Sequence, residues 1–502
     1  GICTSNPSAA KKREEALKNN VETTKTTKGP STLDESKTLK NEEEEIGFQN
    51  IKHFYKFGNI IGSGGFGQVR VCTKIGDETN KLYAVKSIFR HKCEKDIVTE
   101  VQVLITLDHP NIIKFYEFFV DEEYFHLVME LCSGGELIDK IKNQKTISEK
   151  SSTTIVWKML SAISYCHSQG ITHRDLKPEN IMFETNENTN ETDIKLIDFN
   201  LSKDNFNKHN MKSVLGTPFY MAPEVIMGDY DEKCDIWSLG VIAYFMICGV
   251  PPFYDGNSLF NVYNKILSDE LVFKEPIWAT ISEEAKEFIK KCLIKDPKLR
   301  PSGKDMLTDQ WFKNVRKGLA EHESIQDLKD KLNNLKNFSH SQKFKKLILK
   351  CILENVISFS EMKRLRSIFY SMDLDHTGYI NVSELSVAFE KAEIKMSEEE
   401  LNAIIAKCDD RQNGKLDYTE FLVGSLDHDY YINRIILKYV FDQLDIDKSG
   451  KICAEDLRKF FVRAGDNSKS LEEILVLIKE VSKEGRDMIT FEEVCNIFNI
   501  NK

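Results

Sequence analysis

Long hydrophobic runs are missing from this sequence of 502 residues. Its longest apolar stretch, Ile236–Val250, is shorter than the roughly 18 residues that a membrane-spanning helix requires, and Ser238 and Gly240 interrupt it. No charged segment followed by an apolar one precedes a cleavage site near the N-terminus. We therefore expect neither a membrane-spanning helix nor a secretory leader.

Paired cysteines and an excess of positive charge are missing as well. The 12 cysteines show no C-x-x-C pair and no regular spacing, a pattern typical of reduced thiols in a cytosolic protein rather than of a disulfide framework. The formal net charge of −10 argues against a nucleic-acid-binding protein. The length exceeds the size at which a single hydrophobic core keeps growing, so two or more domains are expected.

Aromatic residues are almost absent from residues 1–50, which are rich in Lys, Glu, Thr, Asn and Ser. Because such a composition buries little surface, we expect this segment to be disordered. Its first residues differ, since Gly1 opens a myristoylation pattern and Cys3 is a candidate for palmitoylation. Two acyl chains anchor a protein stably where one does not, so we expect a cytoplasmic protein attached peripherally to membranes. The alternative is that Gly1 is a remnant of expression.

A denser pattern begins near Tyr55. Short β-branched runs at Val69–Thr73, Leu82–Ile88 and Phe125–Glu130 alternate with turn residues and predict a small sheet. Helical periodicity then dominates from Leu137 to about Phe312. Residues 54–312 are therefore predicted to form a sheet-rich lobe followed by a helical lobe.

A glycine-rich motif of the form G-x-G-x-x-G-x-V lies between two strands and reads Gly62-Ser63-Gly64-Gly65-Phe66-Gly67-Gln68-Val69. Dinucleotide-binding folds use a similar string to open a helix, whereas a string between strands favours a flap over ATP phosphates. Lys86, seventeen residues after Val69, can pair with the α- and β-phosphates. Glu100, in the following helical segment, is the expected carboxylate that holds Lys86.

Residues 171–180 read I-T-H-R-D-L-K-P-E-N, and with this string the region resembles a eukaryotic protein kinase of the serine/threonine branch. The resemblance implies that Asp175 accepts the proton of the substrate hydroxyl and that Lys177 stabilises charge on the transferred phosphoryl group. It implies that Asn180 and Asp198 hold magnesium. Further ATP contacts are implied for Ile61, Met129, Glu130, Cys132 and Glu136.

Other motifs of the same family support this resemblance. Ala222-Pro223-Glu224 closes the activation segment, with Arg300 as the expected ion-pair partner of Glu224, and Asp235 matches the aspartate that braces the catalytic loop. Glu136 and Glu179 resemble carboxylates that bind arginines preceding the target serine. Substrates with basic residues near the phosphorylated side chain are therefore expected; the alternative is that Glu136 contacts only the ATP ribose.

One motif departs from the family pattern. Asp198-Phe199-Asn200 has asparagine where the family has glycine, which is used where the backbone adopts angles costly for other residues. Asparagine tolerates the left-handed region better than most residues, and the other catalytic residues are present, so we expect an active kinase. The alternative is a calcium-gated scaffold whose kinase fold is inactive.

Residues 361–502 contain loops at a constant spacing, because Asp373, Asp409 and Asp445 lie 36 residues apart. Each opens the ligand pattern of an EF-hand, which places oxygen atoms at positions 1, 3, 5, 7 and 12 and glycine at position 6. The candidate ligands of loop one (373–384) are Asp373, Asp375, Thr377, the Tyr379 carbonyl and Glu384. Loop three (445–456) offers Asp445, Asp447, Ser449, the Lys451 carbonyl and Asp456, whose side chain is shorter than glutamate.

The other two loops are incomplete. Loop two (409–420) offers Asp409, Asn413, the Lys415 carbonyl and Glu420, but Arg411 occupies position 3 and should weaken calcium binding. Loop four (482–493) retains only Glu493 as a conventional ligand, and Arg486 stands at position 5. We predict that loop four is structural and empty, so that the chain binds two or three calcium ions.

Residues 313–360 are predicted to join the two regions as a junction helix. Within them, Gln342–Ile352 places apolar residues on one helical face, while Lys343, Lys345, Lys346 and Lys350 supply positive charge. Calcium-loaded EF-hands bind basic amphipathic helices of this kind. An ordinary surface helix is the alternative.

The order of kinase, basic helix and four EF-hands resembles the calcium-dependent protein kinases of plants and protists. The resemblance implies an α+β architecture, in which a bilobal kinase fold is followed by an all-α EF-hand domain of two paired lobes. It also implies a monomeric calcium-activated serine/threonine kinase that uses ATP, Mg²⁺ and Ca²⁺, acts on protein substrates and does not require calmodulin. In that family the junction helix blocks the kinase until calcium binds.

Overall fold

The structure is a computed structural model that describes residues 50–500, apart from residues 65–66, 78, 80, 91–99, 186–191, 200–202, 205–217, 255–258, 322–323, 339–342 and 467. The predicted disordered segment and the candidate acylation residues Gly1 and Cys3 lie outside the described residues. Gly65, Phe66 and Asn200 also lie outside them.

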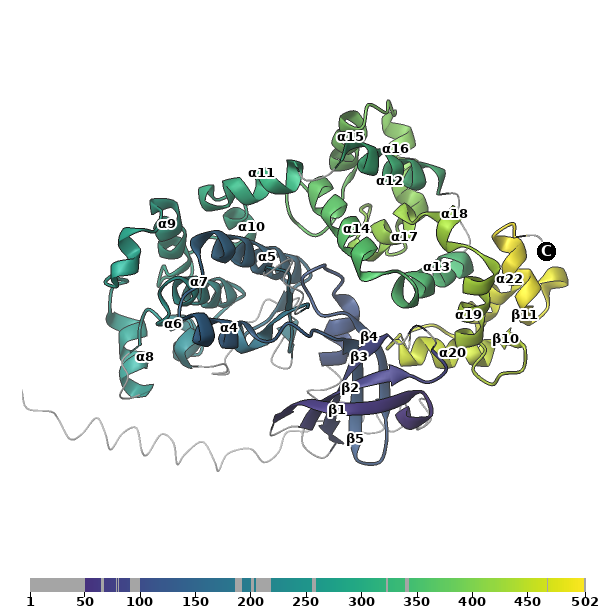
Figure 1. The fold of residues 1–502 in the computed structure, drawn as a ribbon, viewed down its shortest axis with the longest axis horizontal. Helices are drawn as coiled ribbons and strands as arrows, with labels where there is room; N and C mark the ends of the chain where they lie inside the picture. Colours follow the sequence, from purple (N-terminus) through teal and green to yellow (C-terminus); the bar gives the residue numbers. More distant parts are fainter. Residues whose placement is uncertain are drawn as a thin grey trace, which may run out of the picture. The chain divides into compact units, whose positions relative to one another are not determined.

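The predicted small sheet is confirmed (Figure 1). Its neighbouring strands are antiparallel and lie in the order β1-β2-β3-β5-β4. The predicted runs form β2, β3 and β5, whereas β1 was not predicted because three glycines and two register shifts interrupt its alternation. The strands are β1 (Tyr55–Gly64), β2 (Gly67–Lys74), β3 (Leu82–Phe89), β4 (Phe115–Val120) and β5 (Tyr124–Glu130).

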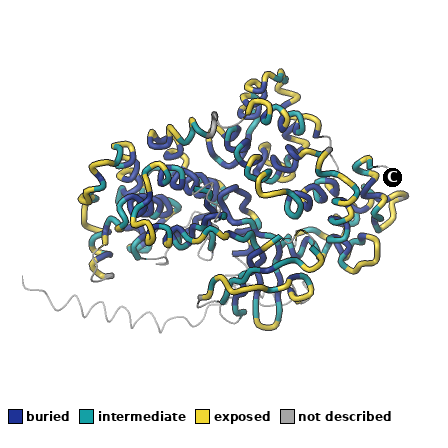
Figure 2. The backbone as a smooth tube through the Cα atoms, viewed as in Figure 1, coloured by how far each residue is buried: buried dark blue, intermediate teal, exposed yellow. Residues whose placement is uncertain are grey.

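The helical lobe is built around two buried helices, α5 (Glu149–Ser168) and α7 (Lys233–Cys248), which Figure 2 colours largely as buried. The apolar stretch at Ile236–Val250 is therefore a core helix of the kinase lobe. Among the described residues, no helix combines the length and hydrophobicity needed to cross a bilayer. The other helices of this lobe are α4 (Leu137–Gln144), α6 (Pro223–Met227), α8 (Leu259–Ser268), α9 (Glu283–Cys292) and α10 (Gly303–Met306).

The end of the activation segment is fixed by the predicted ion pair between Glu224 and Arg300. Both side chains are fully buried, and Arg300 Nη2 donates to Glu224 Oε2 at 3.0 Å, alongside a second bond from Nη1 to Oε1. Removing one partner of a buried pair typically costs about 3–5 kcal/mol, because the other charge is left without compensation. This pair therefore secures α6, which contains Glu224, to the segment that follows α9.

The predicted junction region, residues 313–360, contains three helices instead of one, namely α11 (Lys313–Glu321), α12 (Ile325–Asn337) and α13 (Lys343–Asn355). Helix α13 covers the predicted basic amphipathic stretch. Its apolar residues Phe344, Ile348 and Ile352 are fully buried, and it contacts α17, α19 and α21 of the EF-hand region. This helix is therefore bound by EF-hand helices, and it is not an ordinary surface helix.

One of the four lysines that were predicted to supply positive charge on α13 is not exposed. Lys345 is buried, its ammonium group donates to the carbonyl of Ile497 at 2.9 Å, and it lies over the ring of Phe498. Burial lowers the pKa of Lys345 to about 8. The exposed positive charge of α13 comes from Lys343 and Lys350, while Lys346 pairs with Asp410.

The EF-hand region consists of helix pairs that flank the four loops. Loops one and two are joined by two hydrogen bonds between the backbones of Ile380 and Leu416, at 2.8 and 2.9 Å, and loops three and four by the pairing of β10 (Lys451–Cys453) with β11 (Met488–Thr490). The predicted α+β fold, with a bilobal kinase followed by paired EF-hands, is confirmed. The helices are α14 (Phe359–Met372), α15 (Val382–Lys391), α16 (Glu398–Cys408), α17 (Tyr418–Ser425), α18 (His428–Tyr431), α19 (Arg434–Leu444), α20 (Ala454–Arg463), α21 (Leu471–Lys479) and α22 (Phe491–Ile497).

Candidate active site and calcium loops

An ion-pair triad centres on Lys86 of β3. Its ammonium nitrogen lies 2.8 Å from Glu100 Oε1 and 2.9 Å from Asp198 Oδ1. Burial alone would lower the pKa of Lys86, but the carboxylates of Glu100 and Asp198 outweigh burial and raise that pKa above its usual range. The lysine is therefore charged and held in one position, as phosphate binding requires.

The catalytic loop is held by hydrogen bonds around Asp175. Asn180 Nδ2 donates to the Asp175 carbonyl at 2.9 Å and to its carboxylate at 3.3 Å, and Lys177 Nζ donates to the same carboxylate. Arg174, the preceding residue, has a φ of 68°, a backbone conformation that costs energy for a residue with a side chain. Asp175, Lys177 and Asn180 are thus brought together as the sequence predicted.

Asp235 of α7 holds the backbone of the catalytic loop in place. Its carboxylate accepts hydrogen bonds from the backbone N–H groups of His173 and Arg174, each at 2.9 Å, and lies 2.9 Å from His167 Nε2. Burial raises the pKa of Asp235, but the bond to His167 and the other donors outweigh it and hold this pKa below its usual range. Sequence reasoning identified Asp235 but assigned no role to His173, although it lies within the catalytic-loop string, or to His167, which lies outside that string.

The predicted magnesium ligands are adjacent because of a short antiparallel pair, β7 (Ile181–Phe183) with β8 (Ile194–Leu196). Ile181 pairs with Leu196, and the Ile197 N–H donates to the Asn180 carbonyl at 2.9 Å. Asn180, just before β7, and Asp198, just after β8, therefore flank the same point. Amide and carboxylate oxygens are the hard ligands that Mg²⁺ prefers, so this donor set fits the ion.

The predicted ATP contacts lie along strands of the small sheet that face the position between Asn180 and Asp198. Ile61, Gly62 and Ser63 belong to β1, Gly67, Gln68 and Val69 to β2, and Met129 and Glu130 to the end of β5. The carboxylate of Glu130 lies 2.8 Å from the ammonium group of Lys195, and its backbone N–H donates to the carbonyl of Lys114 at 2.9 Å. Cys132 is buried beyond β5, and Glu136 is the residue before α4.

Glu136 and Glu179 form a negatively charged pair beside the catalytic loop. Burial, Asp139 and Glu179 raise the pKa of Glu136. Glu179 has a buried carboxylate oxygen, Oε2, without a hydrogen-bond partner among the described residues. A buried carboxylate oxygen without a partner is costly, and a cation would relieve that cost.

Loop one presents a cluster of carboxylates with no cation beside it among the described side chains. Oxygen atoms of Asp373, Asp375 and Glu384 lie within 4.8 Å of one another, and Asp373 is completely buried. Burial and the charge of Glu384 raise the pKa of Asp373 well above its usual range. Such a cluster fits a calcium ion, which takes carboxylate oxygens as ligands.

In loops one to three, the residue at position 12 closes the loop by accepting backbone N–H groups from positions 2 and 3. In loop one, Glu384 accepts from Leu374 at 2.8 Å and from Asp375 at 3.1 Å. In loop three, Asp456 accepts from Ile446 and Asp447 at 3.2 and 3.4 Å. The longer distances agree with the shorter side chain of Asp456, although Asp445, Asp447 and Asp456 also converge within 4.8 Å.

Loop two keeps its closure without the ligand at position 3. Glu420 accepts from the backbone N–H groups of Asp410 and Arg411, at 2.6 and 3.2 Å. The guanidinium group of Arg411 turns to Asp417, with Nε 3.1 Å from Oδ2. Asp409, Asn413 and Glu420 remain in the loop, so the donor set fits calcium with one side chain fewer than loop one.

Loop four supplies its own cation. Arg486 Nη2 donates to Glu493 Oε1 at 2.8 Å, and the Lys483 N–H donates to the same oxygen at 2.7 Å. Burial raises the pKa of Glu493, but these bonds, those from Thr490 and the charge of Arg486 outweigh it and lower that pKa. The residues of loop four therefore do not fit a calcium ion.

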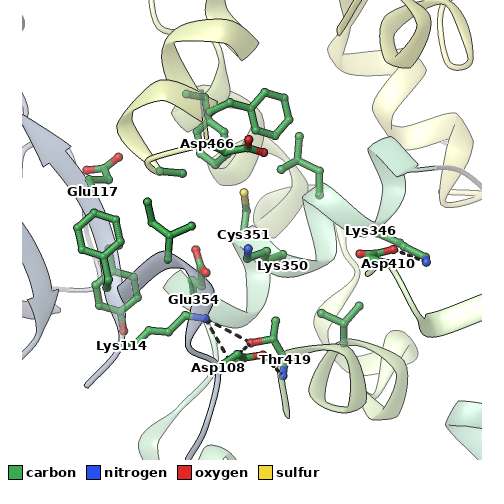
Figure 3. Close-up of a pocket in the computed structure, with 18 of the residues that line it drawn as sticks. Asp108, Lys114, Glu117, Lys346, Lys350, Cys351, Glu354, Asp410, Thr419 and Asp466 are labelled. Atoms are coloured by element: carbon green, nitrogen blue, oxygen red, sulfur yellow. Dashed lines mark hydrogen bonds and ion pairs between the residues drawn. The ribbon is translucent and has the colours of Figure 1, made fainter. Parts of the chain in front are cut away.

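EF-hand residues also contact the kinase lobes, and this contact was not predicted. Thr419 of α17 donates through N and Oγ1 to Asp108, each at 2.8 Å, and Lys114 lies beside both (Figure 3). Arg366 Nη1 donates to Glu184 at 2.5 Å. These side chains are far apart in sequence, so no local pattern could have paired them.

Loop one touches the kinase as well. A Cβ atom on Gly378, whose φ is 81°, would lie 2.8 Å from Tyr165 Cδ2 and 2.9 Å from His109 Cδ2. The ring of Tyr379 lies 5.3 Å from that of Tyr165. Gly378 therefore allows both the turn of loop one and its close approach to the kinase.

Comparison with known proteins agrees with this geometry. Residues 55–312 match the protein kinase domain family, and residues 362–423 and 437–499 match the EF-hand domain pair family. Calcium-dependent protein kinase 5 of Plasmodium falciparum (isolate 3D7) is 36% identical over 437 residues, which cover 86% of this chain and 75% of the relative.

Plant proteins are similarly close. Calcium-dependent protein kinase 21 of Arabidopsis thaliana is 34% identical, over 89% of this chain and 83% of the relative. Calcium-dependent protein kinase 2 of Zea mays is 34% identical, over 89% of this chain and 86% of the relative. With its catalytic residues, its EF-hands and their order along the chain, this protein belongs to the calcium-dependent protein kinases and is a serine/threonine kinase that uses ATP, Mg²⁺ and Ca²⁺.

Proposed function

We propose that this chain is a catalytically active kinase with a preference for basic substrates, held inactive by α13 until calcium binds its EF-hands. The observation that carries the proposal is the ion pair of Lys86 with Glu100, formed with Asp198 beside the same lysine, because kinases need this ion pair and a metal-binding aspartate in place for phosphoryl transfer. The alternative is a calcium-gated scaffold, in which the asparagine at position 200 leaves the kinase fold inactive.

In the proposed reaction, ATP with magnesium supplies the phosphoryl group. Lys86 orients the phosphates, and Asn180 and Asp198 would hold the metal. Asp175 accepts the proton of the substrate hydroxyl, and the ammonium group of Lys177 offsets the negative charge that develops on the transferred group. The hydrogen bonds from Asn180 to Asp175 keep the base oriented.

We expect Asp198→Ala to lower the rate of peptide phosphorylation at saturating calcium by at least about a hundredfold, since it removes a metal ligand and one partner of Lys86. The rate of ³²P transfer from ATP measures this. Asp442→Ala, on the exposed face of α19, is the matched control and should retain the rate of the unaltered protein. Equal rates for the unaltered protein and Asp198→Ala would support the scaffold alternative.

The preference for basic substrates rests on Glu136 and Glu179. The charge of Glu179 raises the pKa of Glu136, and Glu179 Oε2 is buried without a donor in the part of the chain that the structure describes. An arginine near the target serine would supply a charge-assisted hydrogen bond there.

We therefore expect Glu136→Gln/Glu179→Gln to lower kcat/KM for an arginine-containing peptide by about tenfold or more, and to change kcat/KM little for the same peptide with glutamine. Steady-state kinetics on the two peptides measure this, with Asp139→Asn as a neighbouring control. If both peptides lost activity equally and KM for ATP rose, Glu136 would instead be a ribose contact.

Autoinhibition by α13 is supported by its charge and its apolar face. Lys343 and Lys350 are exposed, and they resemble the basic residues expected of a substrate. The apolar face of α13 is covered here by EF-hand helices. If those helices move away, this face is exposed to water unless another protein surface covers it. The acidic pair of Glu136 and Glu179 offers a complementary charge.

Lys343→Ala/Lys350→Ala is therefore expected to raise peptide phosphorylation in the absence of calcium several-fold, while activity at saturating calcium stays unchanged. The ratio of the two rates, measured with a chelator and with excess calcium, reports the block. Lys479→Ala, on α21, is the control for a general loss of positive charge. An unchanged rate in chelator would contradict autoinhibition through these charges.

The proposal assigns calcium to loops one and three, and with a weaker set of ligands to loop two. Loop four is left out because Arg486 already neutralises Glu493. We thus infer two or three ions for each chain.

Membrane attachment is a further part of the proposal and rests on the sequence pattern at Gly1 and Cys3. Gly1→Ala should abolish the incorporation of a myristate label in cells and shift the protein from the membrane fraction. Equal labelling of the two proteins would exclude this attachment.

A further inference from the structure

Arg411 contacts the kinase from inside an EF-hand loop. Its Nη1 donates to the carbonyl oxygen of Thr106 at 3.0 Å, across 305 residues of sequence. On its other side, Nε lies 3.1 Å from Asp417 Oδ2. The side chain that occupies a ligand position of loop two therefore bonds to a carboxylate of its own loop and at the same time joins that loop to the small lobe.

Thr106 ends the helical residues 100–106, of which Glu100 is the first that the structure describes. The last carbonyl groups of a helix lack N–H donors from the following turn. For Thr106 the residue four positions later is Pro110, which has no N–H to donate. A cation at this end also complements the helix dipole, so the guanidinium of Arg411 satisfies the carbonyl and stabilises the helix terminus.

Neighbouring contacts fix the position of loop two against this helix end. Asp108, two residues after Thr106, accepts two hydrogen bonds from Thr419 of α17, and Lys114 lies beside them (Figure 3). Asp410, next to Arg411, pairs with Lys346 of α13. Loop two is thus held from α13 on one side and from the kinase on the other.

We propose that Arg411 is a positioning residue of the kinase, which caps the helix that carries Glu100 and so favours the contact of Glu100 with Lys86. Loop two lacks one calcium ligand because the residue at that position serves the kinase lobe. This inference rests on the kinase activity proposed above, and it does not depend on autoinhibition by α13.

The test uses the full chain with Arg411→Asp, Arg411→Ala and Arg411→Lys. Aspartate is the residue at position 3 of loops one and three, so Arg411→Asp restores a ligand while it removes the cap. Arg486→Ala is the matched control, because Arg486 is also a loop arginine but bonds to Glu493 within its own hand. The three measurements are kcat at saturating calcium, calorimetric calcium binding, and hydrogen exchange of the amides in residues 100–108.

We expect Arg411→Asp to bind calcium in loop two more tightly than the unaltered chain and yet to lower kcat about fivefold, with faster exchange in residues 100–108. Arg411→Ala should show the same losses without the gain in calcium affinity. Arg411→Lys should recover part of kcat, since an ammonium group can also donate to the Thr106 carbonyl. Arg486→Ala should leave kcat and this exchange unchanged.

Tighter calcium binding by Arg411→Asp with unaltered kcat and exchange would overturn the inference, because Arg411 would then be only a missing ligand. Equal losses in Arg486→Ala would also overturn it. An unaltered chain without kinase activity would refute the proposed function instead. Hydrogen exchange in residues 100–108 needs no turnover, so it still tests the cap in that case.

Discussion

The position of one carboxylate, that of Glu100, constrains much of this structure. Lys86 forms its ion pair with Glu100 only if Glu100 approaches it to hydrogen-bonding distance, and Glu100 is the first described residue of a helical segment that ends four residues before a proline. A helix end of that kind cannot satisfy its own carbonyl groups. Contacts from Thr419 and Arg411 gather at this end, so the calcium-binding region supports the geometry of the ATP site in addition to covering α13.

The four EF-hand loops share one electrostatic problem, which is how to compensate a carboxylate that closes the loop. Burial and the charge of Asp375 raise the pKa of Glu384 in loop one against the backbone N–H groups that lower it, and an added cation would relieve the repulsion. Loop four solves the problem within the chain, because Arg486 bonds to Glu493. Loop two lies between these cases, since its arginine pairs with Asp417 of the same loop and also donates to Thr106 of the kinase. The graded loss of ligands along the sequence therefore has a different structural meaning in each loop.

Features set by local sequence could be predicted, and features set by distant contacts could not. The glycine-rich string, the catalytic loop and the ligands of loop one each lie within a dozen residues, where spacing alone determines which side chains converge. The basic helix at α13 was predicted for the same reason, but the burial of Lys345 depends on Ile497 and was not. Arg411 was recognised as an anomaly of its loop. Its partner Thr106 is 305 residues away, beyond the reach of any periodicity.

Gly378 and Tyr379 of loop one lie against Tyr165 of the kinase, so the calcium site and the catalytic lobe share a surface. Thermodynamic linkage then acts in both directions. If calcium binding stabilises this contact, then calcium binds more tightly, by the same free energy, when the kinase is held in the contacting form. In that case a nucleotide or substrate that favours this form also lowers the calcium concentration at half-saturation. The calcium threshold of this protein is thus a property of the occupied enzyme, and its EF-hand loops alone do not set it.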